Sequence, residues 1–265
     1  MNKKKISYLA ILFIIVGTVG GLLTFQFREK NASFSENKTI NSNSINSLEI
    51  KADNAEIEIE PTKNEEISLA LTGENKNTPT LTAEVNNSNL VINVNKEHAF
   101  DLFTFDFYSE PTTLKILLPE KEYEALHVKT NNGAVAINDA KINTLQVNTD
   151  NGRIVLQDLQ TQQTEVQSHN GRISFEYVDG TIKGETNNGR VSFKTADLER
   201  NIQLESNNGR IEVETDKDPI NTTFDVSVDN GSVDILNQYS GSTVIGDGTN
   251  KIILRTDNGR VTVSK

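Results

Sequence analysis

Arginine recurs directly after Asn-Gly pairs in this chain, and the spacing would allow these arginines to bind an anion together. The arginines of four consecutive units are Arg153, Arg172, Arg190 and Arg210. Stacked units would place them about 5 Å apart, in a column that could hold a linear polyanion through bidentate guanidinium contacts. The alternative is structural, because each arginine could instead pair with a nearby acid and cover the turn with its stem. Acids close to them in sequence are Asp150, Glu176, Glu205 and Glu212.

A second cluster is aromatic. Five of the sixteen aromatic residues fall between positions 100 and 108. The residues at the centre of this cluster are Phe103, Phe105, Phe107 and Tyr108. An exposed aromatic edge could contact a membrane or a partner. We favour the alternative, in which these large side chains form a cap that seals the end of a repeat array.

The residue types needed for catalysis or metal binding are not brought together by any recognisable motif. The sequence has no cysteine, and its three histidines, His98, His127 and His169, lack a metal-ligand spacing. No nucleophile elbow, zinc-protease motif or phosphate-binding loop occurs. Asp216 and Asp218 do not have the spacing of an EF-hand calcium loop. We therefore expect no catalytic residues, no cofactor and no metal site.

The charge is unevenly distributed. The whole chain has a net charge of −11, and residues 1–30 alone have +4, which leaves −15 on the remainder. A body this acidic repels nucleic acid over most of its surface, so we expect no nucleic-acid partner.

Seven Asn-Gly pairs define the repeat that must position these side chains. Their asparagines are Asn132, Asn151, Asn170, Asn188, Asn208, Asn230 and Asn258. Successive spacings are 19, 19, 18, 20, 22 and 28 residues, and apolar residues alternate with polar ones on both sides of each pair. This period of two predicts two half-buried strands per unit. Only Gly184 departs strongly from the apolar pattern.

Two all-β architectures fit this repeat. In an antiparallel hairpin meander, each Asn-Gly closes a two-residue type I′ turn. In a single-stranded parallel β-solenoid, similar to a right-handed β-helix, each unit is one coil and the asparagine amides hydrogen-bond from coil to coil. We favour the solenoid because it covers its own apolar residues. A meander would leave an apolar sheet face that no amphipathic helix after residue 28 could cover.

The N-terminal segment predicts a membrane anchor. Residues 6–25 are an uncharged, apolar run of twenty residues that follows Lys3, Lys4 and Lys5. This is long enough for one transmembrane helix, and the lysines place its N-terminus in the cytoplasm. A cleaved signal peptide is the alternative, although its apolar region is usually shorter and ends in a small-residue cleavage site.

The chain therefore divides into three expected parts. We assign residues 1–28 to a cytoplasmic stub and transmembrane signal-anchor, 29–46 to a flexible linker, and 47–265 to an extracytoplasmic β-repeat domain. Within that domain, residues 47–125 would form irregular coils or a cap, and 126–265 the regular Asn-Gly repeats.

The passage LKILLPEKEYEALHVKTNNGAVAI and the recurrent Asn-Gly-Arg units, behind an N-terminal anchor, carry a resemblance. They resemble the bacterial "putative adhesin" β-strand-repeat family, a domain of unknown function that includes LiaG-like membrane-anchored proteins of Gram-positive bacteria. The resemblance covers about residues 47–265. It implies a surface-exposed β-solenoid, and some members of the family lie beside cell-envelope stress-response systems.

These observations give one expected function and two alternatives. We expect a single-pass cell-membrane protein with an extracytoplasmic body that binds or scaffolds without catalysis, in a cell-envelope stress response. Its expected partners are the membrane and either a cell-envelope polymer or a membrane stress-response protein. The alternatives are a β-solenoid enzyme acting on cell-wall polysaccharide and an acidic binder of cationic peptides.

Overall fold

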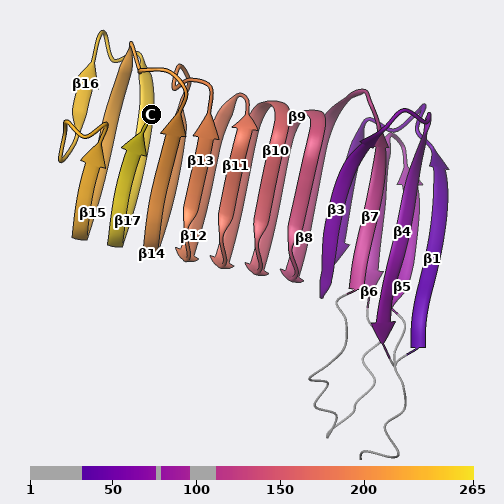
Figure 1. The fold of residues 1–265 in the computed structure, drawn as a ribbon. Coiled ribbons are helices and arrows are strands. Elements are labelled where there is room, and N and C mark those ends of the chain that lie inside the picture. The colour runs from indigo at the N-terminus through magenta and orange to yellow at the C-terminus, as the bar shows by residue number, and fades with distance from the viewer. Residues whose placement is uncertain (1–31, 76–78, 96–111) are drawn as a thin grey trace, which may run out of the picture. The chain divides into compact units, whose positions relative to one another are not determined.

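The computed structural model describes residues 32–75, 79–95 and 112–265, and the secondary structure of these residues is all β (Figure 1). In the described residues, no helix is long and apolar enough to cross a membrane. The predicted signal-anchor at residues 1–28 lies outside the described residues, as do Phe103, Phe105, Phe107 and Tyr108.

The described residues form seventeen strands in one continuously paired array. The first eight are β1 (Ala32–Asn41), β2 (Ser47–Ala52), β3 (Ala55–Thr62), β4 (Glu66–Asn75), β5 (Thr80–Asn86), β6 (Asn89–Asn95), β7 (Thr112–Pro119) and β8 (Glu122–Asn132). The remaining nine are β9 (Val135–Asn151), β10 (Ile154–Asn170), β11 (Ile173–Val178), β12 (Thr181–Asn188), β13 (Val191–Thr195), β14 (Ile202–Thr215), β15 (Thr222–Ile235), β16 (Thr243–Ile245) and β17 (Asn250–Ser264).

Equivalent residues of successive units stack in parallel and in register. Ile154 of β10 pairs with Val135 of β9 on one side and with Ile173 of β11 on the other. The same holds for the second half of each unit, where Val166 of β10 pairs with Val147 of β9 and with Gly184 of β12. The predicted parallel β-solenoid is therefore confirmed, and each repeat unit is one coil.

The Asn-Gly pairs are corners of the coil, and the hairpin interpretation of them is wrong. A type I′ turn requires a positive φ at both central residues. Among the described residues, positive φ occurs at none of the seven asparagines and, of the glycines that follow them, only at Gly231. Left-handed backbone is instead found at the opposite corner of three coils, at Asp139, Asp158 and Tyr177.

Each coil encloses its own apolar residues between two facing layers of strands. In β9, the part that follows one Asn-Gly corner buries Val135 and Ile137, and the part that leads into the next corner buries Leu145 and Val147. Because side chains of a strand alternate between faces, the residues between these point outward and are polar or small. This explains the period of two in the sequence.

Gly184 is an exception to the apolar pattern because a phenyl ring occupies the space of its side chain. A Cβ placed at Gly184 would lie 2.9 Å from Cε2 of Phe175, which projects from the facing layer. Phe175 itself meets Phe193 edge to face, with ring centroids 6.1 Å apart. The large phenylalanine and the missing side chain therefore fill one volume together.

The order of coils in space differs from their order in the sequence at both ends of the array. The coil of β17 lies between those of β14 and β15, paired in parallel with each, so that Arg210 is in register with Arg260 and Arg260 with Ser232. At the other end, β2 lies between β6 and β8, and β3 lies between β7 and β9. At the C-terminal end the chain skips the place next to β14, and β17 fills it later. At the other end the first coil, made of β2 and β3, has later strands stacked on both of its sides.

Antiparallel strands terminate the parallel layers. At one end β4 pairs with β7 and β5 pairs with β6, while β1 pairs with β4. At the other end β16 pairs with the first residues of β15.

The flexible linker expected at residues 29–46 is wrong for residues 32–46. Residues 32–41 form β1, and Phe34 and Ile40 pack on the core while Ile45 is fully buried. The Lys121 ammonium group fixes the following bend by donating to the carbonyls of Ser42 and Ile45 at 2.6 and 2.7 Å. A segment poor in apolar residues is ordered here because the end of the array offers it an open strand edge.

Candidate functional site

The Asn-Gly corner carries a continuous ladder of side-chain amides. Each Nδ2 donates to the Oδ1 of the neighbouring coil's asparagine at 2.8–3.1 Å. In spatial order the ladder runs through Asn54, Asn132, Asn151, Asn170, Asn188, Asn208, Asn258 and Asn230. Asn54, in the degenerate Asn-Ala corner of the first coil, extends the seven asparagines of the regular repeats by one rung.

The glycine of each corner is required by close stacking. A Cβ at Gly189 would overlap the carbonyl oxygen of Gly171 in the adjacent coil, and one at Gly209 would overlap the carbonyl oxygen of Gly189. The backbone conformation of these glycines does not demand glycine, because their φ is not positive. The residue is therefore fixed by the distance between coils rather than by turn geometry.

A column of buried hydroxyls lies beneath the glycines. Thr186 and Ser206 donate to the carbonyl oxygens of Gly171 and Gly189 at 3.2 and 3.0 Å, and Thr256 donates to Gly209 at 3.2 Å. These bonds satisfy carbonyl groups that the tight stacking removes from water.

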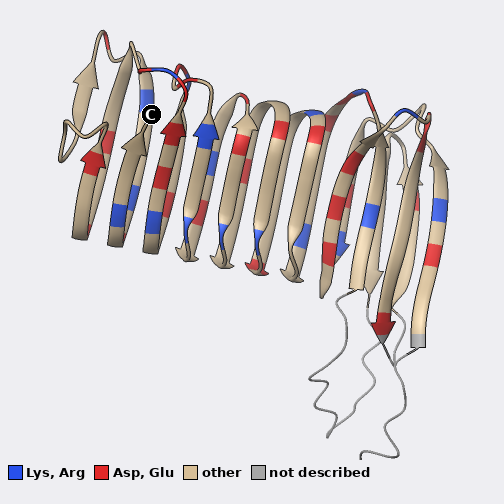
Figure 2. Cartoon of the chain, viewed as in Figure 1, with Lys and Arg blue, Asp and Glu red and all other residues tan. Residues whose placement is uncertain are grey.

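The residue after the glycine forms an arginine column that is one member longer than the sequence order indicates. Each arginine directly precedes a buried residue that is in register with its counterpart in the next coil. The column consists of Arg153, Arg172, Arg190, Arg210 and Arg260. Arg260 joins because β17 lies beside β14, whereas in the sequence the next unit after Arg210 carries Ser232. Figure 2 shows blue segments recurring along the lower edge of successive coils.

Four of these five arginines lack an acidic partner among the residues that the structure describes. Arg190 lies 3.4 Å from Glu212, and Arg260 donates through Nε to the Ser232 hydroxyl at 3.1 Å. Within the described part of the chain, Arg153, Arg172 and Arg210 have no carboxylate at ion-pair distance, and all three are exposed. Acids that could have neutralised the column pair elsewhere: Asp150 contacts His169, and Glu205 contacts Arg255.

The outward columns beside the corner are mixed in residue type. One runs through Lys129, Asn148, Gln167, Glu185, Glu205, Arg255 and Ser227. The column on the other side of the arginines runs through Ala136, Val155, Ser174, Ser192, Glu212, Thr262 and Asp234. Neither keeps one residue type, so the coils do not impose a single side chain on outward positions.

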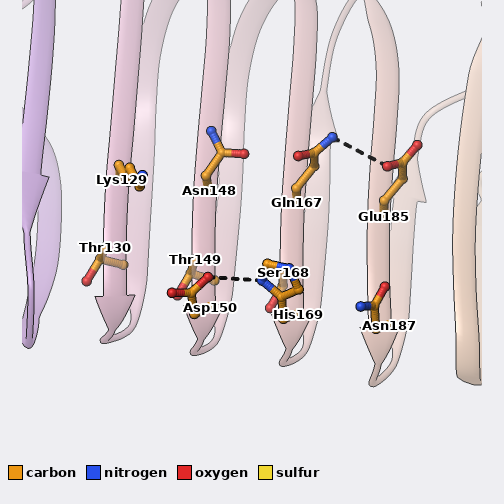
Figure 3. Close-up of a pocket in the computed structure, with 10 residues that line it drawn as sticks. All are labelled: Lys129, Thr130, Asn148, Thr149, Asp150, Gln167, Ser168, His169, Glu185 and Asn187. Carbon is orange, nitrogen blue, oxygen red and sulfur yellow. Dashed lines mark hydrogen bonds and ion pairs between the residues drawn. The ribbon is translucent and has the colours of Figure 1, made fainter.

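A shallow groove of about 410 Å³ lies on the face that leads into the corner (Figure 3). Figure 3 shows amide and carboxylate side chains along it, with Gln167 contacting Glu185 at 3.4 Å and His169 contacting Asp150 at 3.0 Å. The buried hydroxyls of Thr130, Thr149 and Ser168 line its floor.

The pKa shifts of the described residues have structural causes, namely burial and hydrogen bonds between side chains. Burial raises the pKa of Tyr123 to about 12, and its hydroxyl donates to the carbonyl of Pro119 at 3.3 Å. Burial also lowers the pKa of Lys121. The pKa of Lys183 is raised by hydrogen bonds to Glu185 and Glu165, against a smaller opposing effect of burial. Among the described residues, no group of three or more His, Cys, Asp or Glu side chains is arranged to hold a metal ion.

Several solved structures are similar to this chain. A "putative cell adhesion protein" from Clostridium sporogenes is 10% identical, covers 88% of this chain and 99% of its own, and gives a TM-score of 0.43. A "putative adhesin" from Bacteroides fragilis is 14% identical, covers 87% and 97%, and gives 0.44. A "putative lipid binding protein" from Parabacteroides distasonis is 15% identical, covers 87% and 97%, and gives 0.35. No curated protein matches the sequence.

A family match covers the body of the solenoid twice. The family described as Toastrack DUF4097 matches residues 45–181 and again residues 130–264. Together these matches span both the irregular first coils and the regular Asn-Gly repeats. They confirm the resemblance to a family of unknown function that the repeat units carry. The chain belongs to the Toastrack DUF4097 family.

Proposed function

We propose that this chain is a membrane-anchored extracytoplasmic protein whose β-solenoid body binds or scaffolds at the cell surface without catalysing a reaction. The observation that carries the proposal is that the structural residues and the outward-facing residues occupy separate positions of each coil. Inward positions and the Asn-Gly corner are occupied by residues that hold the stack together. The outward columns form long, regular faces with shallow grooves, which suit an extended partner better than a small substrate.

The proposed anchor rests on the sequence before the solenoid. Twenty uncharged residues follow three lysines, and the composition of this run matches a single span with its N-terminus in the cytoplasm. The proposed partners are the membrane, through this anchor, and a cell-envelope polymer or a stress-response protein, through the solenoid. A role in envelope stress rests on the resemblance to LiaG-like proteins. Over most of its surface the acidic body repels a wide polyanion such as duplex nucleic acid.

Membrane topology tests the first half of the proposal. The full chain with a C-terminal tag should sediment with membranes, and protease added to intact cells whose wall has been removed should destroy the tag. A matched variant, Ile14→Lys with Ile15→Lys, places two charges in the apolar run and should release the chain from the membrane fraction. A tag protected from protease in intact cells would overturn the proposed orientation.

A turnover assay tests the second half. The full chain incubated with cell-wall polysaccharide should release no more reducing ends than a heat-inactivated sample. Release above that background would favour the alternative, a solenoid enzyme acting on wall polysaccharide.

A further inference from the structure

We propose that the arginine column, Arg153, Arg172, Arg190, Arg210 and Arg260, binds a linear polyanion that carries phosphate groups and lies along the axis of the stack. This inference rests on the proposed binding function and deepens it by naming the chemical class of the ligand.

The uniformity of the column is the first argument. Three outward or corner columns keep one residue type through five consecutive coils: the asparagines, the glycines and the arginines. The asparagines are kept by the amide ladder and the glycines by the close approach of the coils. The arginines make no comparable contact, since four of the five lack an acidic partner among the described residues and Arg260 contacts only the Ser232 hydroxyl. The architecture therefore accounts for two of the three columns and leaves the arginines unexplained.

The second argument is energetic. Coils are spaced about 4.8 Å apart, so the five arginines extend over roughly 19 Å. Like charges this close repel one another even in water. The exposed side chains of Arg153, Arg172 and Arg210 can spread to lessen the repulsion, but intramolecular carboxylates of the described residues do not remove it. A ligand with several negative groups in a row would neutralise them, and each guanidinium group can grip a phosphate through two parallel hydrogen bonds.

The third argument concerns the shape of the ligand. Acidic residues flank the column in the sequence of the coils: Asp150 comes three residues before Arg153, and Glu212 follows Arg210 and contacts Arg190 at 3.4 Å. The body as a whole is strongly acidic. A flat anionic surface such as a bilayer would bring its charges near these carboxylates as well as near the arginines. A single narrow chain touches only the column, and we therefore infer a linear polymer rather than a membrane.

The test measures binding of fluorescently labelled, long-chain inorganic polyphosphate to the full chain held in phosphatidylcholine nanodiscs. Fluorescence anisotropy should report binding that weakens as salt is raised. The variant Arg172→Gln with Arg210→Gln removes two unpaired charges and keeps most of each stem, and it should weaken binding about tenfold. The matched control, Lys63→Gln with Lys141→Gln, removes the same charge from exposed positions off the column and should change the affinity less than about twofold.

Competitors distinguish the sources of phosphate. Unlabelled polyphosphate should displace the probe, whereas orthophosphate and phosphatidylglycerol vesicles at equal phosphate concentration should displace it poorly. Displacement by vesicles at lower phosphate concentration than by polyphosphate would overturn the choice of a linear chain.

The remaining outcomes are equally decisive. Absence of polyphosphate binding, or equal losses in the arginine variant and the lysine control, would overturn the site. A lowered urea midpoint for the arginine variant would show that the column is structural instead. The topology and turnover experiments use no polyanion, so the proposed function can stand or fail separately from this inference.

Discussion

Asn258 donates a 2.9 Å side-chain hydrogen bond to Asn208, a residue fifty positions earlier in the chain. Asn230, which lies between them in sequence, is the terminal rung beyond Asn258 instead. This exchange of neighbours follows from the position of β17 between β14 and β15. The same exchange brings Arg260 beside Arg210 and lengthens the arginine column.

Removing one interior rung of the ladder should destabilise the solenoid. Asn188→Ala deletes the donor to Asn170 and the acceptor for Asn208, which lie at 2.8 and 3.0 Å. We expect a loss of about 1–2 kcal/mol in the free energy of unfolding, measured by urea titration. Asn187→Ala, at the adjacent exposed position outside the ladder, is the control and should cost less than about 0.5 kcal/mol. Equal effects of the two substitutions would contradict a stabilising ladder.

A methyl group at a corner glycine should be far more damaging. Gly189→Ala would overlap the carbonyl oxygen of Gly171 and force two coils apart, at a cost of about 3 kcal/mol or more. Gly241→Ala meets nothing within 4 Å and serves as the control. Thermal unfolding of both variants checks the expectation. If Gly189→Ala were as stable as the wild type, stacking distance could not be the reason for glycine at the corner.

The volume shared by Gly184 and Phe175 predicts coupling between substitutions. Gly184→Ala should cost about 1–3 kcal/mol because its Cβ would press on the phenyl ring. Phe175→Leu leaves space, so the double variant should be more stable than the sum of the single losses implies. Combining Gly184→Ala with Phe224→Leu, on the distant strand β15, should give additive losses. Additivity in the first pair would contradict the shared volume.

Loss of β17 should expose its neighbours on both sides. A chain lacking residues 249–265 leaves β14 and β15 without their common partner. Hydrogen exchange should then show lost protection of amides across β15, whose remaining strand partner is the three-residue β16. Removing Lys265 alone deletes only an exposed ion pair with Asp218 and should leave protection intact. Persistent protection of β15 in the longer truncation would argue against this strand order.

The pKa of Asp197 predicts a small acid-sensitive contribution to stability. Burial raises this pKa, but hydrogen bonds from the backbone N–H of Glu199 and from the Arg200 guanidinium outweigh it and hold the pKa below the ordinary value of an aspartate. A depressed folded-state pKa contributes stability above the unfolded value, and this is lost as pH falls through the folded value.

The variant Asp197→Asn isolates that contribution. It should be less stable than wild type near pH 7 by up to about 1 kcal/mol, because the carboxylate is about a third exposed. The difference measured by urea unfolding should shrink as pH falls below about 4. A difference that grows with acidity would contradict the assignment.

The residues inside the coil were predictable because the alternation of apolar and polar residues is visible in each short stretch of sequence. Alternation around each Asn-Gly pair determines which residues point inward, and residues such as Ile154 and Val166 are buried as that pattern requires. The φ values of the corner were not predictable from the dipeptide, since Asn-Gly is equally suited to a hairpin. The stacking of coils, a property of the whole array, decides between a hairpin turn and a solenoid corner.

The pairing of distant segments could not be read from local sequence. β1 finds an edge supplied by β4, and its own composition gives little sign of a strand. One signal for the position of β17 was present: Asn258-Gly259-Arg260-Val261 resembles Asn208-Gly209-Arg210-Ile211 more closely than Asn230-Gly231-Ser232-Val233 does. Units that lie side by side in the array are therefore the more similar pair, although they are not consecutive.

The position of β17 also has a consequence for the order in which the protein can be assembled during synthesis. A ribosome produces β14 and β15 before β17, yet these two strands have no direct pairing with each other and are joined only through the later one. β14 can stack on β12 and β13 as it emerges, but β15 cannot join the parallel array until β17, which ends at Ser264, has been made. A chain interrupted before that point carries an open strand edge that a protease or chaperone can recognise.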